Sequence, residues 1–404
     1  MSQPELQLEY RGGAEAQDAG TARLKPLMRS IGSVAGALIG LILVLAIFGA
    51  WSPRLFLRAD TFVNVLKYNY AYAVAAVGAT FVIITAGIDL SVASVMALAG
   101  VACAMAVTGV TIPEFDVGQM IVIALGVALT CGLCTAGFLL QRGTSRTRSV
   151  AVGSAAAIAG AVVSGLLWWL IAGRKVAPMP VWAGVSIGIA TGGLVGLFNG
   201  LLITSLSLPP FIVTLGTLGG VRGLVLYMTG SMPIDGLPDA LLRMHSASWL
   251  GLPPNVWITV VLILIAAPVL HFSVMGRYVY AIGSNERTAR LCGVSVERWK
   301  TICYIVAGLT AGLAGVMMDS RLHSAIPSEY QGWELTIIAA VVIGGTSLFG
   351  GEGTMIGSII GVLMIGFLRS GCNLAGVEAN LQQVFIGAII VLAAAVDRFR
   401  HLTG

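Results

Sequence analysis

Long apolar runs, separated by short breaks of glycine, proline, charged or polar residues, occupy most of the 404-residue chain. A run of about 20 apolar residues is long enough to cross a bilayer as a helix. The runs predict about twelve spans, near 31–51, 69–87, 91–110, 118–140, 151–173, 181–205, 208–228, 255–273, 301–318, 335–350, 354–371 and 382–396. The shorter runs 208–228 and 335–350 are candidates for tilted, broken or re-entrant segments.

The composition supports this interpretation. Charged residues make up 10% of the chain and hydrophobic residues 57%, whereas soluble domains carry about 25% charged residues. The 52 glycines favour close contacts between helices through small faces. The predicted fold class is therefore an all-α polytopic membrane protein. We expect a cytoplasmic tail at 1–30, a membrane permease domain at 31–400 and a short C-terminal end at 401–404.

Basic residues predict the orientation in the membrane, because loops rich in Lys and Arg stay in the cytoplasm. They precede the first span, follow the last span and fill two inner loops, as Arg23, Lys25, Arg29, Arg142, Arg146, Arg148, Arg277, Arg287, Arg290, Arg298, Lys300, Arg398 and Arg400. Both termini are then cytoplasmic, and the loop 229–254 lies outside. A smaller set disagrees with this orientation, namely Arg54, Arg58, Lys67, Arg174 and Lys175. We expect the first three to lie in an amphipathic segment on the membrane surface.

The largest polar segment is residues 276–300, GRYVYAIGSNERTARLCGVSVERWK, between two apolar runs. Residues 285–292 are mostly tolerated in helices, and Gly293 follows as a stop signal. The pattern predicts a short amphipathic helix at the cytoplasmic surface. Such a helix is typical of a docking site for a cytoplasmic partner. The alternative is that its cations only fix the topology.

Three residues at or within the apolar runs are candidates for a pore or gate. Asp89 follows Gly87 in a break, where it can cap the next helix or contact a solute. Asn199 can hydrogen-bond between helices or offer its amide to a hydroxylated solute. Phe211 can stack on a sugar ring or serve ordinary packing. Arg222 lies inside an apolar run and needs a partner, which the sequence does not name.

No catalytic or metal-binding constellation stands out, so we expect neither enzymatic activity nor a cofactor. The glycine-rich segment 344–353 lacks the lysine of a nucleotide-binding loop, and it lies between spans instead of between a strand and a helix. It fits a tight turn between broken helices. The break at 87–91 is similar to it, as in transporters built from two related halves.

Several segments resemble the sugar-type permeases of bacterial ABC importers, the branch for ribose, xylose, arabinose and galactose. They occur in the family's order, as VIITAGIDLS at 82–91, GLFNG at 196–200, PFIVTLGT at 210–217, YAIGSN at 280–285, ARLCGV at 289–294 and VIGGTSLFGG at 342–351. The resemblance covers most of residues 60–400. Residues 118–179 depart from it, because they hold two extra apolar runs. We interpret them as a two-span insertion that preserves the orientation of the later spans.

The resemblance implies a permease subunit in the bacterial inner membrane that imports a monosaccharide, with a pentose such as ribose or xylose favoured. It implies a homodimeric pore, a periplasmic sugar-binding protein and a cytoplasmic ATP-binding subunit that hydrolyses the ATP. It places the contact with that subunit in the loop 276–300, at Gly283, Asn285, Glu286, Arg287, Ala289, Arg290 and Gly293.

Two kinds of alternative remain open. The same class of permease can carry a nucleoside, a polyol or the furanosyl signal molecule autoinducer-2, and nothing in the sequence separates these from a pentose. An ion-coupled secondary transporter is a second alternative, although it would favour acidic residues within spans, and few besides Asp89 are present.

Overall fold

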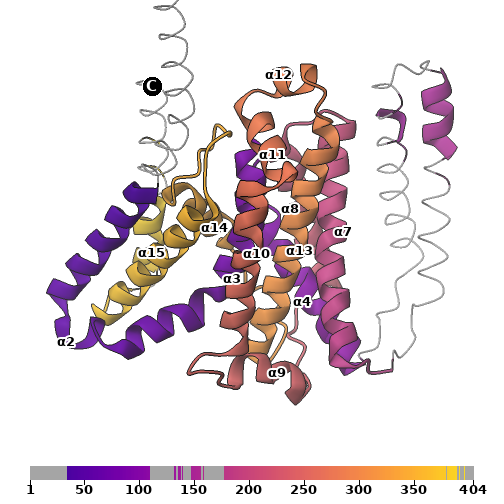
Figure 1. Ribbon diagram of the computed structural model, residues 1–404. Helices are drawn as coiled ribbons and strands as arrows, with labels where there is room; N and C mark the ends of the chain where they lie inside the picture. Colours follow the sequence, from indigo (N-terminus) through magenta and orange to yellow (C-terminus); the bar gives the residue numbers. More distant parts are fainter. Residues whose placement is uncertain are drawn as a thin grey trace, which may run out of the picture.

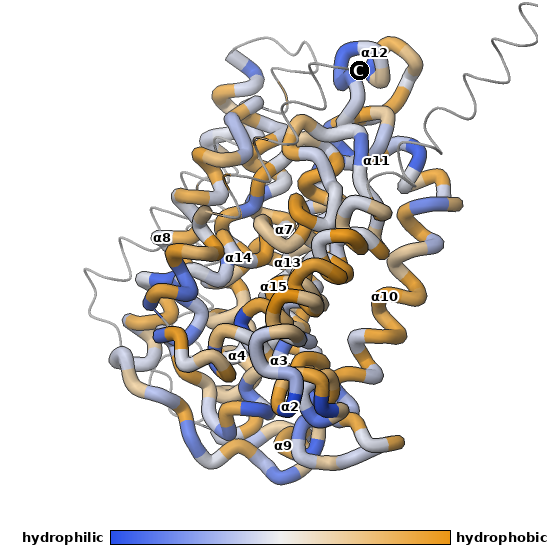
Figure 2. Tube along the Cα trace, turned by 90° about the vertical axis from the view of Figure 1, so that its left-hand side faces the viewer, coloured by the Kyte–Doolittle hydropathy of each residue, from blue (hydrophilic) through white to orange (hydrophobic). Residues whose placement is uncertain are grey.

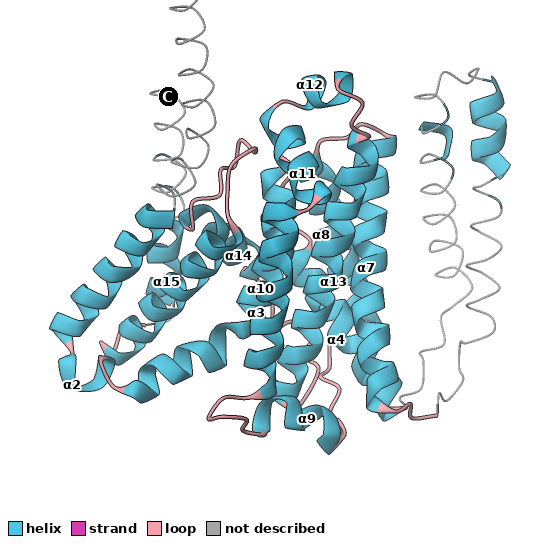
Figure 3. Cartoon of the chain, viewed as in Figure 1, coloured by secondary structure: helices cyan, strands magenta, loops and turns pink. Residues whose placement is uncertain are grey.

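The computed structural model describes residues 34–109, 177–378 and 380–388, together with short pieces between 132 and 158 and residues 391 and 395. Within these ranges the chain forms helices joined by loops and contains no β-strand (Figures 1 and 3). The predicted ends 1–30 and 401–404 lie outside the described residues. So do most of 118–179 and part of 382–396. The total of twelve spans and the two-span insertion therefore remain predictions.

A first helix, Val34–Trp51, enters the described region. The helices that follow are α2 (Pro53–Phe56), α3 (Ala59–Ile84), α4 (Val92–Thr108), α7 (Val181–Ser205), α8 (Pro210–Thr229), α9 (Asp239–Ser246), α10 (Pro254–Phe272), α11 (Val274–Ser284), α12 (Glu286–Leu291), α13 (Val296–Leu322), α14 (Trp333–Ile343) and α15 (Met355–Leu374). Six helices are long and apolar enough to span a membrane: Val34–Trp51, α7, α8, α10, α13 and α15. The shorter α4 and α14 are also apolar.

The predicted spans agree with these helices in order, but two bounds were wrong. Helix α3 begins at Ala59 and not near residue 69, because its first turns carry the polar residues Asp60, Asn64 and Lys67 and continue the helix beyond its apolar part. Helix α14 ends at Ile343 instead of reaching residue 350. It stops there because Gly345 adopts a positive φ of 92°, which an L residue rarely adopts.

The centre of the molecule is built on close contact between α7 and α13. Glycines recur every four residues along α7, at Gly188, Gly192, Gly196 and Gly200, and so share one side of the helix. A methyl group built on Gly192 would overlap the carbonyl oxygen of Gly308 in α13, and one on Gly196 would overlap that of Tyr304. The missing side chains therefore let the two backbones touch, as small-residue faces do in membranes.

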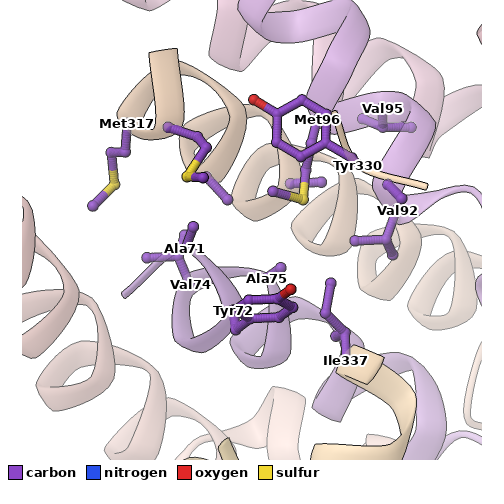
Figure 4. Packing of buried hydrophobic residues seen from close by; sticks show 14 of the residues in the cluster. Ala71, Tyr72, Val74, Ala75, Val92, Val95, Met96, Met317, Tyr330 and Ile337 are labelled. Atoms are coloured by element: carbon purple, nitrogen blue, oxygen red, sulfur yellow. The ribbon is translucent and has the colours of Figure 1, made fainter. Parts of the chain in front are cut away.

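Helices α3, α4 and α14 complete the core around α13. In Figure 4, Val74 and Ala75 of α3 lie among side chains from α4, α13 and α14, and these form one buried apolar cluster. Figure 1 places α12 at one end of the bundle and α9 at the opposite end. Figure 2 shows α8 at the edge of the molecule, on the side away from α10. The described residues thus form a tightly packed centre between two polar ends, with α8 among the less buried apolar helices.

Candidate functional site

The first break in the helices separates α3 from α4, as the sequence predicted. Ala86 adopts a positive φ of 58°, a conformation that is uncommon for a residue with a side chain. Gly87 follows, and a methyl group there would lie 2.8 Å from the hydroxyl of Tyr304. The backbone is therefore turned sharply where it is pressed against α13.

Asp89 lies inside this break, buried, and belongs to a closed network of hydrogen bonds. Its Oδ1 accepts from the backbone amide of Ser91 at 2.9 Å and from the Ser91 hydroxyl at 2.6 Å. This turn holds the residue immediately before α4. The carboxylate therefore serves the start of the helix, although it binds the amide two residues on and not an amide inside the first turn.

Asn199 connects that turn to two other helices. From α7 its Nδ2 donates to the Ser91 hydroxyl at 2.9 Å, and its Oδ1 accepts from Thr217 of α8 at 2.6 Å. Thr214 of α8 also donates to the carbonyl of Ile88 in the break, at 3.1 Å. The network ties the start of α4 to both α7 and α8, which favours the interpretation of Asn199 as a bridge between helices.

Phe211, the third pore candidate, is not part of this network. Its side chain is 51% exposed on α8, whereas Thr214 and Thr217 of the same helix face inward. Arg222 is half-buried further along α8, and no described residue hydrogen-bonds or ion-pairs with it. The structure thus brings Asp89 and Asn199 together and leaves Phe211 apart from them.

The second break, residues 344–354, joins α14 to α15. Gly345, Gly350, Gly351 and Gly353 all have positive φ values, from 75° to 149°, so only glycine fits this path without strain. Thr354 then caps α15 by accepting a hydrogen bond from the amide of Gly357 at 3.0 Å. This confirms the prediction of a tight turn between broken helices.

The polar segment 276–300 forms a compact hairpin of α11, α12 and the start of α13. Helix α12 confirms the predicted short helix, with Asn285 as its N-cap and Gly293 following it at a φ of 83°. Ile282, Ala289 and Val296 form a small apolar cluster between the three helices, with Val294 and Trp299 packed against it. The sequence did not predict α11, whose residues continue almost directly from α10.

Ion pairs close the hairpin on its outside. Glu286 accepts from Lys300 Nζ at 2.6 Å and from Arg290 at 3.3 Å, and Arg290 also pairs with Glu297. Burial works to raise the pKa of Glu286, but the hydrogen bonds and charges of Lys300 and Arg290 outweigh it and lower the pKa. The hydrogen bond to Glu297 is the main cause that raises the pKa of Arg290. Both groups are charged at neutral pH, and each pair is worth about 1 kcal/mol or less at such exposed positions.

The residues expected to contact an ATP-binding subunit therefore divide into two sets. Most of them build the hairpin: Gly283, Asn285, Glu286, Ala289, Arg290 and Gly293. Arg287 is exposed on α12 and makes no ion pair with a described residue. Four residues further along α12, Leu291 is 89% exposed, which is unusual for a large apolar residue on a charged helix. Arg287 and Leu291 are exposed on α12 and take no part in the ion pairs of the hairpin.

The base of this hairpin touches both helix breaks. A methyl group on Gly283 would overlap the carbonyl oxygen of Ile84 at the end of α3 and the amide nitrogen of Gly351. The Gly351 amide itself donates to the Ile84 carbonyl at 2.8 Å. Tyr280 of α11 donates to the carbonyl of Gly353 at 2.7 Å. Three segments far apart in the sequence thus meet at one point.

Within the described residues no group of three or more His, Cys, Asp or Glu side chains is placed to hold a metal ion. Sequence reasoning missed Ser91, Thr217, Tyr280 and Lys300, because isolated hydroxyls and a lysine beside a span give no signal until the fold supplies their partners.

Comparisons with known proteins agree with this picture. A family described as branched-chain amino acid transport system / permease component matches residues 120–394. The ribose import permease protein of Bacillus subtilis is 35% identical over 365 residues, which are 90% of this chain and 92% of the relative. The D-allose transport system permease protein of Escherichia coli K12 is 30% identical over 367 residues, 90% of this chain and 91% of the relative.

A third relative is similar over a shorter stretch. The L-arabinose transport system permease protein of Escherichia coli K12 is 34% identical over 221 residues, 55% of this chain and 67% of the relative. No solved structure matches the chain significantly. The relatives are permease components of transport systems, which confirms the prediction of a multi-pass transport subunit that is not an enzyme.

Proposed function

The chain belongs to the family described as branched-chain amino acid transport system / permease component, and we propose that within this family it carries a monosaccharide across the inner membrane into the cytoplasm. The observation that supports a sugar is the similarity, over about nine tenths of the chain, to permeases named for ribose and D-allose. Ribose and L-arabinose, the latter from the shorter match, favour a pentose as substrate.

Uptake in proteoliposomes tests the choice of solute. The complete transporter is assembled with its partner subunits, and labelled ribose uptake is measured against competing solutes. Competition by pentoses, and none by leucine, supports the proposal. Competition by a nucleoside, a polyol or autoinducer-2 instead would assign the same permease to that solute, and competition by branched-chain amino acids would overturn the sugar assignment.

We propose that a cytoplasmic ATP-binding subunit docks on α12. Two exposed side chains support this: Arg287, a residue type enriched among interface hot spots, and Leu291, a large apolar residue that is 89% exposed. A substrate-binding protein would meet the opposite end, at the loop 229–254 and α9. In this orientation both termini lie in the cytoplasm.

A pull-down tests the docking site. Arg287→Glu reverses the outward charge without breaking an internal pair, so the ATP-binding subunit is expected to be lost from the purified complex. Arg298→Glu on the start of α13 is the control, because it reverses another exposed charge of the same segment outside α12. Equal binding by wild type and Arg287→Glu would rule out this contact.

We propose that two copies pair through the uncovered side of α8. Its glycines Gly216, Gly219, Gly220 and Gly223 recur at three- and four-residue steps, and a methyl group on any of them would meet nothing within 4 Å. Arg222 lies about 10 Å from the end of the helix, and a charge at that depth is costly against lipid. A second copy would cover the glycines. Arg222 would then line a polar pathway between the two copies, with Phe211 at the inner end of that pathway.

In this proposal Asp89 and Asn199 position the pathway helices and do not contact the solute. Oδ1 of Asp89 accepts from Ser91, and both polar atoms of the Asn199 amide are bonded, to Ser91 and Thr217. The predicted segment 118–179 would lie beside this core as an addition to it.

One observation favours ion-coupled transport as a second candidate. Asp319 of α13 is 1% exposed, forms no ion pair with a described residue, and its Oδ2 lacks a hydrogen-bond partner. A buried acid of this kind is a candidate ion or proton site. Uptake that needs a proton or sodium gradient, and continues without ATP, would favour this candidate over the first.

A further inference from the structure

We propose that Gly283 at the base of α12 is a relay point, through which movement of the cytoplasmic hairpin reaches both helix breaks at once. The proposal rests on the proposed function, because it assumes that a partner moves α12. It adds a positioning role for Gly283, Tyr280, Gly350 and Gly351, none of which needs to touch the partner or the solute.

The hairpin is built to move as one body. The apolar cluster of Ile282, Ala289 and Val296 joins α11, α12 and α13 on the inside. Glu286 of α12 pairs with Lys300 of α13, and Arg290 of α12 pairs with Glu286, so the outer contacts join α12 to α13. Because the inner cluster spans all three helices and Ser284 at the end of α11 leads through Asn285 directly into α12, a displacement of α12 also displaces the end of α11.

The end of α11 has no free space in which to absorb that displacement. Gly283 lies directly against the carbonyl of Ile84, the last residue of α3. On the other side it faces the amide of Gly351, which is itself hydrogen-bonded to Ile84 at 2.8 Å. Ser284 touches the same glycine, since a methyl group on Gly351 would lie 2.5 Å from its Oγ. Close-packed contacts of this kind transmit displacement instead of cushioning it.

Each break in turn leads to a different part of the bundle. Ala86 and Gly350 contact each other where the two breaks meet, and a methyl group on Gly350 would lie 2.8 Å from the Ala86 side chain. The first break continues through Asp89 and Ser91 to α4, and through Asn199 to α7 and α8. The second break continues directly into α15. One contact therefore reaches both α8 and α15.

The breaks are places where such a shift can occur, because turn residues absorb dihedral change more readily than helices do. Tyr280 adds a second attachment, since its hydroxyl donates to the Gly353 carbonyl one turn below Gly283. The relay thus consists of one steric contact and one hydrogen bond from the same helix. These can be altered separately.

Gly283→Ala tests the steric contact in the complete transporter. The added methyl group forces the end of α11 away from Ile84 but does not change the docking side chains Arg287 and Leu291 themselves. We expect the ATP-binding subunit to co-purify as with wild type and to hydrolyse ATP, while solute uptake per ATP falls about tenfold or more, as overpacking of this kind shifts conformational populations. Gly276→Ala is the matched control, because it lies on α11 as well but crowds the Leu270 carbonyl of α10 and touches neither break.

Tyr280→Phe tests the hydrogen bond and keeps the proposal testable if Gly283→Ala does not fold. It removes only the hydroxyl, and we expect uptake per ATP to fall several-fold while complex assembly and ATP hydrolysis persist. Tyr278→Phe on the same helix, where the ring packs against Trp299, is its control and should behave as wild type.

The outcomes separate the relay from the function on which it rests. If wild type assembles and transports, but Gly283→Ala and Tyr280→Phe keep the wild-type ratio of uptake to ATP hydrolysis, the relay is wrong. The relay is also wrong if Gly276→Ala lowers that ratio as much as Gly283→Ala does, because general strain in α11 would then explain the loss. If wild type neither binds an ATP-binding subunit nor transports a sugar with ATP, the proposed function fails first and the relay fails with it.

Discussion

Helices α7 and α8 follow each other in the chain and are both rich in glycine, but the two sets of glycines have opposite surroundings. On α7, Gly192 and Gly196 are pressed against the backbone of α13. On α8, Gly219 and Gly223 have nothing within 4 Å of where a methyl group would be.

The difference shows that glycine spacing identifies a contact face without identifying what contacts it. In a membrane, helices associate through close packing of small faces, because lipid is as apolar as the side chains. The α7 face finds its partner within the chain. The α8 face has none among the described residues, and its cation Arg222 makes a purely lipid-facing position costly.

The largest loss of stability is expected when the glycine face of α7 is filled. Gly196→Leu would place a side chain where the Tyr304 carbonyl of α13 now lies. We expect a loss of about 3 kcal/mol or more, seen as aggregation or a much lower unfolding temperature in detergent. An unfolding temperature equal to wild type would show that α7 and α13 are not in direct contact.

A smaller effect is expected at the polar bridge between the two helices. Thr217→Val keeps the shape of the side chain but removes the donor to Asn199 Oδ1, leaving that buried oxygen unsatisfied. The expected cost is about 1–2 kcal/mol, measured as a lower unfolding temperature. Thr229→Val is the control, because its hydroxyl bonds only to carbonyls of its own helix, and it should change stability by less.

Filling the α8 face should spare the subunit and affect only its assembly. The side chain of Gly219→Leu occupies open space. We therefore expect the free energy of unfolding of the monomer to change by no more than about 0.5 kcal/mol, with a correspondingly small shift of its unfolding temperature. The fraction of dimer, measured by native mass spectrometry or cross-linking in lipid nanodiscs, should fall about tenfold or more. A dimer fraction equal to wild type would place the contact between copies elsewhere.

The smallest effect is expected when one position on α8 and one on α7 are compared for their access to water. In a cysteine-free background, Arg222→Cys on α8 and Leu194→Cys on α7 are treated with a membrane-impermeant thiol reagent. Thiols react as thiolates, which form in water and not in lipid, so we expect labelling of Arg222→Cys to be at least about tenfold faster. Equal and slow labelling at both positions would show that α8 faces lipid.

The sequence by itself determined where the helices and their breaks lie. Run length, glycine and charge are local properties, and they located α7, α10, α12 and both breaks to within a few residues. They were less accurate for α3 and α14. At the start of α3 a polar segment continues as helix, and at the end of α14 a single glycine ends the helix before its apolar run stops. The ordered motifs also placed the chain in its family before any contact was known.

Only the tertiary structure decided which of these local features meet. The sequence showed glycines on α7 and α8 alike, and it gave Asp89 and Asn199 several roles each. The fold placed one glycine face against α13, bound Asp89 to Ser91 and Asn199 to Thr217, and brought Gly283 between Ile84 and Gly351. Such contacts join residues far apart in the chain, and a hydroxyl or a glycine acquires its role only from the atom that the fold places beside it.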